Sequence, residues 1–145
     1  MKALLQRVTH ASVTVGGEIT GRIDQGLLVL LGVEKGDDQT TADKLLEKIL
    51  KYRVFADAED KMNLSLQDIN GGLLLVSQFT LVAETKKGLR PSFSSAAPPA
   101  EGKRLYEYLL NQAQQKWPAT ASGRFGADMK VELLNDGPVT FLLEA

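Results

Sequence analysis

The chain offers few side chains for catalysis. It has one histidine, His10, and no cysteine among its 145 residues, which excludes thiolate nucleophiles and sulfur-rich zinc sites. His10 is flanked by Thr9, Ala11 and Ser12 and lacks the His-x-Glu or His-x3-His spacing that brings a metal partner. We therefore interpret His10 as a structural or surface residue, and we expect neither a metal nor a cofactor.

Hydroxyl groups are the remaining nucleophiles. A conventional esterase needs a nucleophile, a base within hydrogen-bond reach and a group that orients the base. Ser77 and Thr80 could act as nucleophiles, but the sequence identifies no base for Thr80. There is no Gly-x-Ser-x-Gly elbow and no Walker-type phosphate loop, since Gly16-Gly17 and Gly71-Gly72 lack the lysine and the pattern. Direct attack by Thr80 on an ester stays open as an alternative.

Two short segments combine apolar runs with residues suited to a site. Ser77-Gln78-Phe79-Thr80-Leu81 ends the run from Gly72 to Val76, and active-site groups are often carried at such strand ends. Asn135-Asp136-Gly137-Pro138-Val139-Thr140 leads into a run that ends at Leu143. Proline cannot donate an N–H to a sheet ladder, so we expect the Gly-Pro pair at a strand start, an edge or a bulge. A tight turn without chemical function is the alternative.

Together with Gly88 to Phe93 and Gly123 to Met129, these segments resemble the D-aminoacyl-tRNA deacylases over the whole chain. SQFTL and NxGPVT are the two signature motifs of that family, and both are complete here. The resemblance implies a hydrolase that cleaves the ester of D-aminoacyl-tRNA, frees tRNA and the D-amino acid, and spares L-aminoacyl-tRNA. A noncatalytic tRNA-binding module that kept the pocket is the alternative from a different class.

By this resemblance, Ser77, Gln78, Phe79 and Thr80 form the catalytic segment. The backbone around Phe79 and Thr80 would supply N–H donors to the developing oxyanion, while Ser77 and Gln78 support the pocket geometry. The free hydroxyl beside the ester on the terminal ribose can assist attack by water. The protein then needs only to orient the ester and admit a water molecule.

The resemblance also assigns the choice between D and L forms to Gly137 and Pro138. It implies a cis pair that reaches in from the partner subunit of a homodimer, contacts the substrate's amino group and leaves no space for an L side chain. Because D and L forms share size and charge, exclusion by a clash separates them better than attraction. Glycine would escape this exclusion, so we expect activity on glycine mischarged on a noncognate tRNA such as tRNA-Ala.

The nucleotide end of the substrate needs an apolar pocket and cations. Phe79, Ala127 and Met129 are candidates for the adenosine pocket, with core packing as the alternative for Met129. Candidates for phosphate contacts are Lys86, Lys87, Arg90 and Arg124.

The charge distribution is compatible with such contacts. The net charge of -1 argues against a strongly basic nucleic-acid binder, but residues 85–130 hold eight basic and three acidic side chains. A modest basic face can bind a phosphate backbone. An ordinary solvated surface is the alternative.

Length and hydropathy point to one domain outside the membrane. A chain of 145 residues suits one domain that buries about two-thirds of its unfolded surface. The longest apolar stretch, Gly26 to Val33, has eight residues, well short of the roughly 18 that a membrane span requires. We expect a single domain over residues 1–145 in the cytoplasm, without a membrane partner.

The elements that would position these residues follow from periodicity. We expect a hairpin of Leu4 to Val15 with Glu18 to Thr20 around Gly16-Gly17, and a central strand from Gly26 to Val33. A helix capped by Thr40 and Asp43 should run to Tyr52, and another from Pro99 to Pro118. The remaining strand candidates are Arg53 to Ala56, Asn63 to Leu66, Leu73 to Phe79, Lys130 to Leu134 and Val139 to Leu143.

This order of elements indicates an α/β fold in which strands outnumber helices, so that sheet packs on sheet as well as on helix. Thr85 to Pro99 is too irregular for an element and too long for a simple connection, which is typical of a binding loop. The family resemblance implies stacked, barrel-like mixed sheets with two main helices on one side, in a homodimer.

Overall fold

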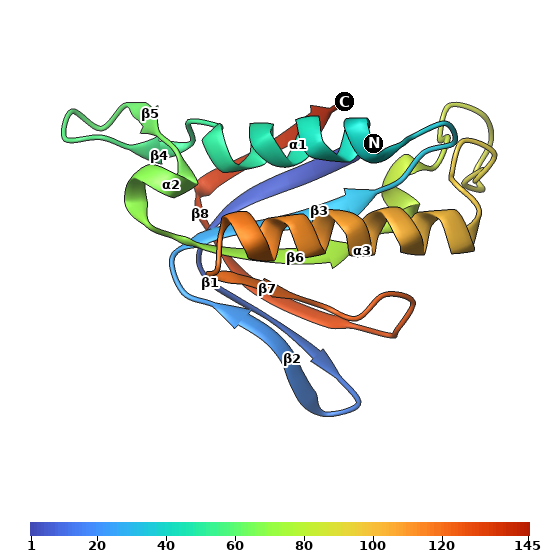
Figure 1. Ribbon diagram of the computed structural model, residues 1–145, viewed down its shortest axis with the longest axis horizontal. Coiled ribbons are helices and arrows are strands. Elements are labelled where there is room, and N and C mark those ends of the chain that lie inside the picture. The colour runs from blue at the N-terminus through green and yellow to red at the C-terminus, as the bar shows by residue number, and fades with distance from the viewer.

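One long strand, β1 (Lys2–Val15), organises the sheet in the computed structural model, which describes residues 1–145 (Figure 1). The chain turns at Gly16 and Gly17, both with positive φ, into β2 (Glu18–Ile23), which confirms the predicted hairpin. The next strand, β3 (Gly26–Gly32), pairs along the same edge of β1. Strands β2 and β3 therefore share one edge of β1 and leave the other edge for a later strand.

The rest of the sheet is mixed. Strand β6 (Gly72–Ser77) runs parallel to β3, and the short β7 (Thr120–Ser122) runs parallel to β6. The last strand, β8 (Lys130–Glu144), lies antiparallel along the free edge of β1. Two further strands, β4 (Phe55–Ala56) and β5 (Met62–Leu64), form a separate pair.

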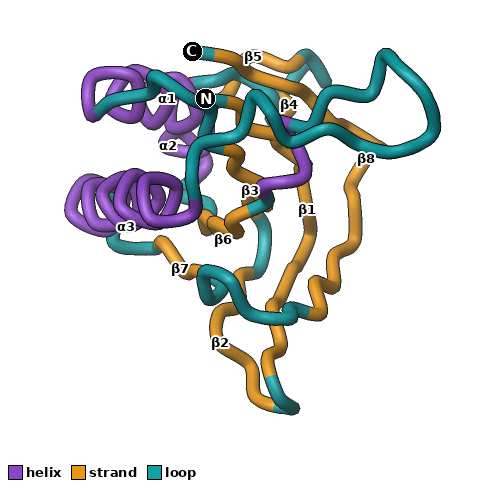
Figure 2. The backbone as a smooth tube through the Cα atoms, turned by 90° about the vertical axis from the view of Figure 1, so that its right-hand side faces the viewer, coloured by secondary structure: helices purple, strands orange, loops and turns teal.

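The main sheet curls until its ends nearly meet (Figure 2). The Thr20 hydroxyl on β2 donates to the Ser122 carbonyl on β7 at 3.4 Å. A Cβ at Gly21 would overlap that same carbonyl, so glycine permits the close approach. The predicted α/β, barrel-like mixed sheet is confirmed, except that the strands form one nearly closed sheet and a small pair rather than stacked sheets.

Two helices, α1 (Gln39–Lys51) and α3 (Pro99–Lys116), cover one face of the sheet, as expected (Figures 1 and 2). Alternation along β3 and β6 separates two apolar clusters: Leu27 and Leu73 face the helices, whereas Leu28 and Leu74 face the inside of the curl. Because both faces are buried, β3 and β6 are apolar throughout. None of the helices has the length and apolar character needed to cross a bilayer.

The cap of α1 differs from the predicted one. Asp38 accepts from the backbone N–H of Thr41 at 2.9 Å, so the capping pair lies two residues before Thr40 and Asp43. Asp43 has another partner, since its carboxylate accepts from the Tyr108 hydroxyl of α3 at 2.9 Å. A contact between the two helices therefore uses the side chain that the sequence suggested as a cap.

Several short elements were missed or given wrong bounds. Strand β6 ends at Ser77 rather than Phe79, because the chain turns there into the 3-10 helix η1 (Phe79–Val82). Ser65 caps a four-residue helix, α2 (Leu66–Ile69), which ends the Asn63 to Leu66 strand candidate at Leu64. Only Phe55–Ala56 of the Arg53 to Ala56 candidate is a strand. Helix α2 and strand β7 are too short to show a period in the sequence.

The two predicted C-terminal strands are one strand with an irregularity. Pairing passes from Gln6 opposite Thr140 to Val8 opposite Asn135, so β8 uses five residues where β1 uses two. Gly137 and Pro138 lie in this bulge, and the peptide bond between them is cis. Of the three predicted placements for the Gly-Pro pair, a bulge is the one observed, and the segment lies within a strand rather than in a tight turn.

Candidate functional site

The carboxyl end of β6 borders two cavities, one on each side of Phe79. One, of about 280 Å³, lies beneath the start of α3, and the other, of about 250 Å³, lies against the loop before β8. Ser77, Phe79 and Gly126 line both. A third depression, of about 550 Å³, is open and polar and lies at the opposite end of β6, near Gly72. Ser77, Gln78 and Phe79 of the SQFTL motif therefore border the first two cavities and not the third.

The cavity beneath α3 is largely apolar and aromatic. Tyr106 and Phe125 lie on its wall with ring centroids 5.8 Å apart. The buried Tyr106 hydroxyl donates to the Leu75 carbonyl at 3.0 Å, and burial raises the pKa of Tyr106 far above its usual range. This tyrosine therefore stays neutral and structural. Phe125 was missed as a candidate, although it lies inside the Gly123 to Met129 segment that carried the resemblance.

The second cavity brings together the three residues predicted to form the adenosine pocket. Phe79, Ala127 and Met129 all line it, and so does Gln78. The sulfur of Met129 accepts a hydrogen bond from the backbone N–H of Arg124 at 3.4 Å. This bond links the two ends of the loop that precedes β8. Phe79 is 62% exposed, an unusual state for an aromatic ring that only packs in a core.

Thr80 is exposed and lines neither cavity. Its hydroxyl accepts a hydrogen bond from the Gln78 side-chain amide, and an amide N–H cannot take a proton from it. His10, the only imidazole, is exposed on β1, as predicted. The pairing of Ala3 with Leu31 and of Leu31 with Ser77 places His10 about 23 Å along the strand direction from the site. His10 is therefore too remote to act as a base for Thr80.

The turn after β6 leaves two backbone donors free. In η1 the first N–H to bond back is that of Leu81, which donates to the Gln78 carbonyl at 3.1 Å. The N–H groups of Phe79 and Thr80 precede this bond and have no partner within the helix. Two adjacent donors, one of them on Phe79, which lines both cavities, are suited to a developing negative charge on oxygen.

Gly137 and Pro138 line neither cavity of their own chain. They lie on β8, with β1 and β3 between them and strand β6. Around them, Arg7 donates to the carbonyls of Asp136 at 3.1 Å and Val54 at 2.8 Å. The Asn135 amide donates to the carbonyls of Arg7 at 3.1 Å and Val139 at 3.0 Å. These bonds hold the bulge in one shape.

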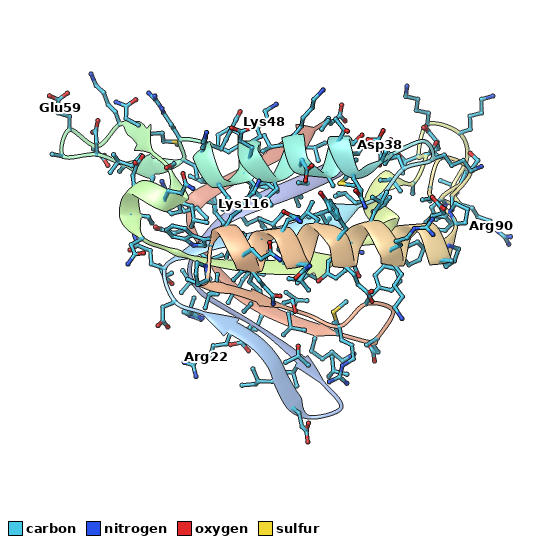
Figure 3. All side chains as sticks on the ribbon, viewed as in Figure 1. Arg22, Asp38, Lys48, Glu59, Arg90 and Lys116 are labelled. Carbon is cyan, nitrogen blue, oxygen red and sulfur yellow. The ribbon has the colours of Figure 1, made fainter.

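The candidate phosphate ligands lie around the rim. Lys86, Lys87 and Arg90 are exposed on the loop that follows η1, and Arg124 is exposed on the loop before β8. Arg90 projects from the end of the molecule where α3 begins (Figure 3). The structure thus gathers the Ser77 to Thr80 segment, the adenosine candidates and the basic loops at one end, and leaves the Gly-Pro pair elsewhere.

The family model for D-Tyr-tRNA(Tyr) deacylase matches residues 4–144. The chain belongs to this family. The D-aminoacyl-tRNA deacylase of Stutzerimonas stutzeri is 69% identical over 145 residues, and that of Pseudomonas aeruginosa 66%, with all of each chain covered. The predicted family, and with it a hydrolase that acts on the ester bond of an aminoacyl-tRNA, is confirmed.

Solved structures share the fold. The c-Myc DNA unwinding element binding protein superposes with a TM-score of 0.95 at 42% identity, covering 100% of this chain and 99% of that one. A probable eukaryotic D-amino acid tRNA deacylase superposes with a TM-score of 0.84 at 16% identity, covering 99% and 98%. The curled sheet with helices on one side is therefore the common frame of these proteins.

Replacement of Arg7 by alanine tests the support of the Gly-Pro bulge. Arg7→Ala removes two backbone contacts from a side chain that is only 15% exposed, so we expect a loss of about 1–3 kcal/mol in the free energy of unfolding. Urea denaturation measures this loss, and hydrogen exchange should rise at Asn135 to Val139. The matched control is Lys2→Ala, which breaks an exposed ion pair with Glu144 between the same two strands and should cost less than about 1 kcal/mol. Equal costs would contradict a special role for Arg7.

Proposed function

We propose that this hydrolase removes D-amino acids from tRNA, and that the ester is bound at the end of β6 between the two cavities. One observation carries the proposal: Ser77, Gln78 and Phe79 of the complete SQFTL motif border the same cavity as Ala127 and Met129. We place this activity in the cytoplasm, where charged tRNA is used.

Catalysis then rests on backbone donors and on the substrate. The free N–H groups of Phe79 and Thr80 stabilise the oxyanion that forms when water attacks the ester. The hydroxyl beside the ester on the terminal ribose assists that water, which fits the lack of a base near Thr80. Ser77 and Gln78 hold the turn, and the Gln78 amide orients the Thr80 hydroxyl. The protein mainly supplies position and charge stabilisation.

The terminal adenine is proposed to lie among Phe79, Ala127 and Met129. An aromatic face and a thioether give apolar contact to a base without requiring a particular tRNA sequence. Beyond it, the cations Lys86, Lys87, Arg90 and Arg124 contact phosphates of the acceptor end. Their positions around the rim of the cavities support a path of the tRNA acceptor end from the adenine pocket toward these cations.

Selection against L-amino acids is assigned to Gly137 and Pro138 of a second subunit. In one chain this pair is separated from the cavities by β1 and β3, so a partner must deliver it. The bonds from Arg7 and Asn135 make it rigid enough to act as a wall. An L side chain would strike the wall, a D side chain would point away, and glycine would pass. Removal of glycine mischarged on tRNA-Ala follows from the same geometry.

A homodimer is therefore part of the proposal. Strand β8 is paired on one edge only, and it exposes the apolar side chains of Leu134, Phe141 and Leu142. An exposed apolar edge strand is a surface that proteins usually cover. A two-fold arrangement would place the bulge of each subunit at the cavity of the other.

Two alternatives remain distinguishable. A Thr80 nucleophile would require a base, and the hydrogen bond that Thr80 receives is from an amide donor. A noncatalytic binding module would retain the pocket without turnover. The name of the neighbour with a TM-score of 0.95 refers to DNA binding, but the net charge of -1 gives this chain little general attraction for duplex DNA.

The first test compares three esters. We expect rapid deacylation of D-tyrosyl-tRNA, and of glycine carried by tRNA-Ala. L-tyrosyl-tRNA should be slower by at least roughly 100-fold, since a clash of about 3 kcal/mol corresponds to that ratio. Loss of radiolabelled amino acid from each tRNA measures the rates at limiting enzyme. Equal rates on the D and L esters would indicate an unselective esterase. No turnover of any ester would indicate the binding module.

The second test concerns the subunit arrangement. If the Gly-Pro pair acts in the partner's cavity, discrimination between D- and L-tyrosyl-tRNA requires the dimer. Sedimentation equilibrium should show a dimer at assay concentrations, and dilution should reduce the D to L ratio in step with dissociation. A monomer that keeps full discrimination would refute delivery by a partner.

The third test separates the roles of the Thr80 hydroxyl and backbone. Thr80→Ala keeps the N–H group, so we expect kcat/KM for D-tyrosyl-tRNA to fall less than about tenfold. Thr80→Ser serves as the conservative control. Loss of a true nucleophile would cost roughly 10⁴-fold or more. A drop of that size in the alanine variant, together with inactivation by a serine-directed covalent inhibitor, would establish Thr80 as the nucleophile instead.

A further inference from the structure

The segment from Thr85 to Pro91, which we term the arm, projects from the rim of the site as a closed loop. At its base Glu84 and Ser92 exchange two backbone hydrogen bonds, of 2.7 and 3.0 Å. The Ser95 hydroxyl donates to the Glu84 carboxylate at 3.2 Å, which braces the base further. All seven residues of the arm are exposed. The arm is thus a defined projection with a fixed base.

The side chains of the arm are unusual for a surface loop. It holds three cations, Lys86, Lys87 and Arg90, and no acidic residue. None of the three forms an ion pair, although nine ion pairs occur elsewhere in the chain. Among them stands Leu89, whose exposed fraction is 103%. The chain therefore presents a cluster of unneutralised charge around one entirely uncovered apolar side chain.

The base of the arm is coupled to the cavities. Phe93, directly after the base, packs on Phe79 with ring centroids 5.1 Å apart. Ala97, further along the same loop, lines the cavity beneath α3. Each limb of the arm has about three residues, so its tip reaches about 10 Å beyond the base. That length is enough to carry the cations past a nucleotide placed at Phe79 by the proposed function.

We infer that the arm is the element that grips the tRNA strand beyond the terminal adenosine. Lys86, Lys87 and Arg90 neutralise consecutive phosphates, and Leu89 packs against a ribose or the face of a base. The inference rests on the proposed function and adds to it: the arm separates the binding of tRNA from the chemistry at Phe79. It acts on KM and leaves kcat to the motif segment.

RNA suits the arm better than a protein partner does. Protein interfaces are depleted of lysine at their centres and need a patch of apolar residues, whereas the arm has one leucine among lysines. Nucleic acid offers both features at once, since phosphates neutralise cations and apolar side chains can contact or wedge against bases. Charge complementarity therefore favours the acceptor end of the tRNA as the binding partner of the arm.

The experiment compares two substrates that share the reacting ester. One is D-tyrosyl-tRNA. The other is adenosine that carries D-tyrosine on its ribose, and this small ester lacks the part of the tRNA that the arm would contact. The arm variants are the triple Lys86→Ala, Lys87→Ala, Arg90→Ala and the single Leu89→Ser. The matched control removes the same charge from the exposed helix residues Lys44, Lys48 and Lys116, of which the last two are labelled in Figure 3. Binding of uncharged tRNA and sedimentation are measured for every variant.

We expect the arm triple to raise KM for D-tyrosyl-tRNA roughly tenfold or more near physiological salt. The slope of log affinity for tRNA against log salt should fall by about 2, at about 0.7 for each lost phosphate contact. Leu89→Ser should raise KM several-fold without changing the salt slope. Turnover of the adenosine ester should stay within about twofold of the wild type, and the control triple should leave both substrates unchanged.

Three results would overturn the inference. Equal losses on both substrates would mean that the arm only supports the cavity through Phe93. No loss on tRNA, or an equal loss in the control triple, would mean that its cations are ordinary solvated charges. A shift from dimer to monomer in Leu89→Ser would make Leu89 a contact between subunits. If the wild type turns over neither ester but binds tRNA through the arm, the proposed function fails while the arm's role stands.

Discussion

The pairing of β1 along both of its edges is the constraint on which the site depends. On one edge it binds β3, which in turn aligns β6 and so sets the position of Ser77. On the other edge it binds β8 and the bulge that contains Gly137 and Pro138. Because unpaired backbone groups in a buried strand are costly, neither edge can slip alone. Strand β6 and the Gly137-Pro138 bulge are therefore held in a fixed relation, although they lie on opposite sides of β1.

That arrangement bears on the proposed selection against L side chains. The sheet keeps Gly137 and Pro138 away from the cavities of their own chain, so under the proposed function a partner subunit delivers them. Arg7 helps to fix this arrangement, because it lies on β1 and donates a hydrogen bond to the Asp136 carbonyl on β8. A rigid wall matters more than an attractive contact here, since D and L forms differ only in direction.

The chemistry also follows from what surrounds Phe79. A chain with one remote histidine and a Thr80 hydroxyl bonded to an amide has no conventional base. Backbone N–H groups and the ribose hydroxyl of the substrate can meet the same need, because the ester is already reactive and mainly requires position. The exposure of Phe79 and its contact with Phe93 then connect the reacting end to the loop that extends toward the rest of the tRNA.

The sequence by itself determined the long elements, the two motifs and the family. Long apolar periods identified α1, α3, β3 and β6, and the proline of the second motif indicated a strand start, an edge or a bulge. Only the tertiary structure decided which strand ends meet. The bond from Arg7 to Asp136 spans 129 residues. Asp43 accepts from Tyr108 of α3 while Asp38 caps α1, and Phe125 lies beside Tyr106 on the cavity wall. Local periodicity reports which face of an element is buried, whereas contacts between distant residues depend on sheet register and helix packing, which no local pattern contains.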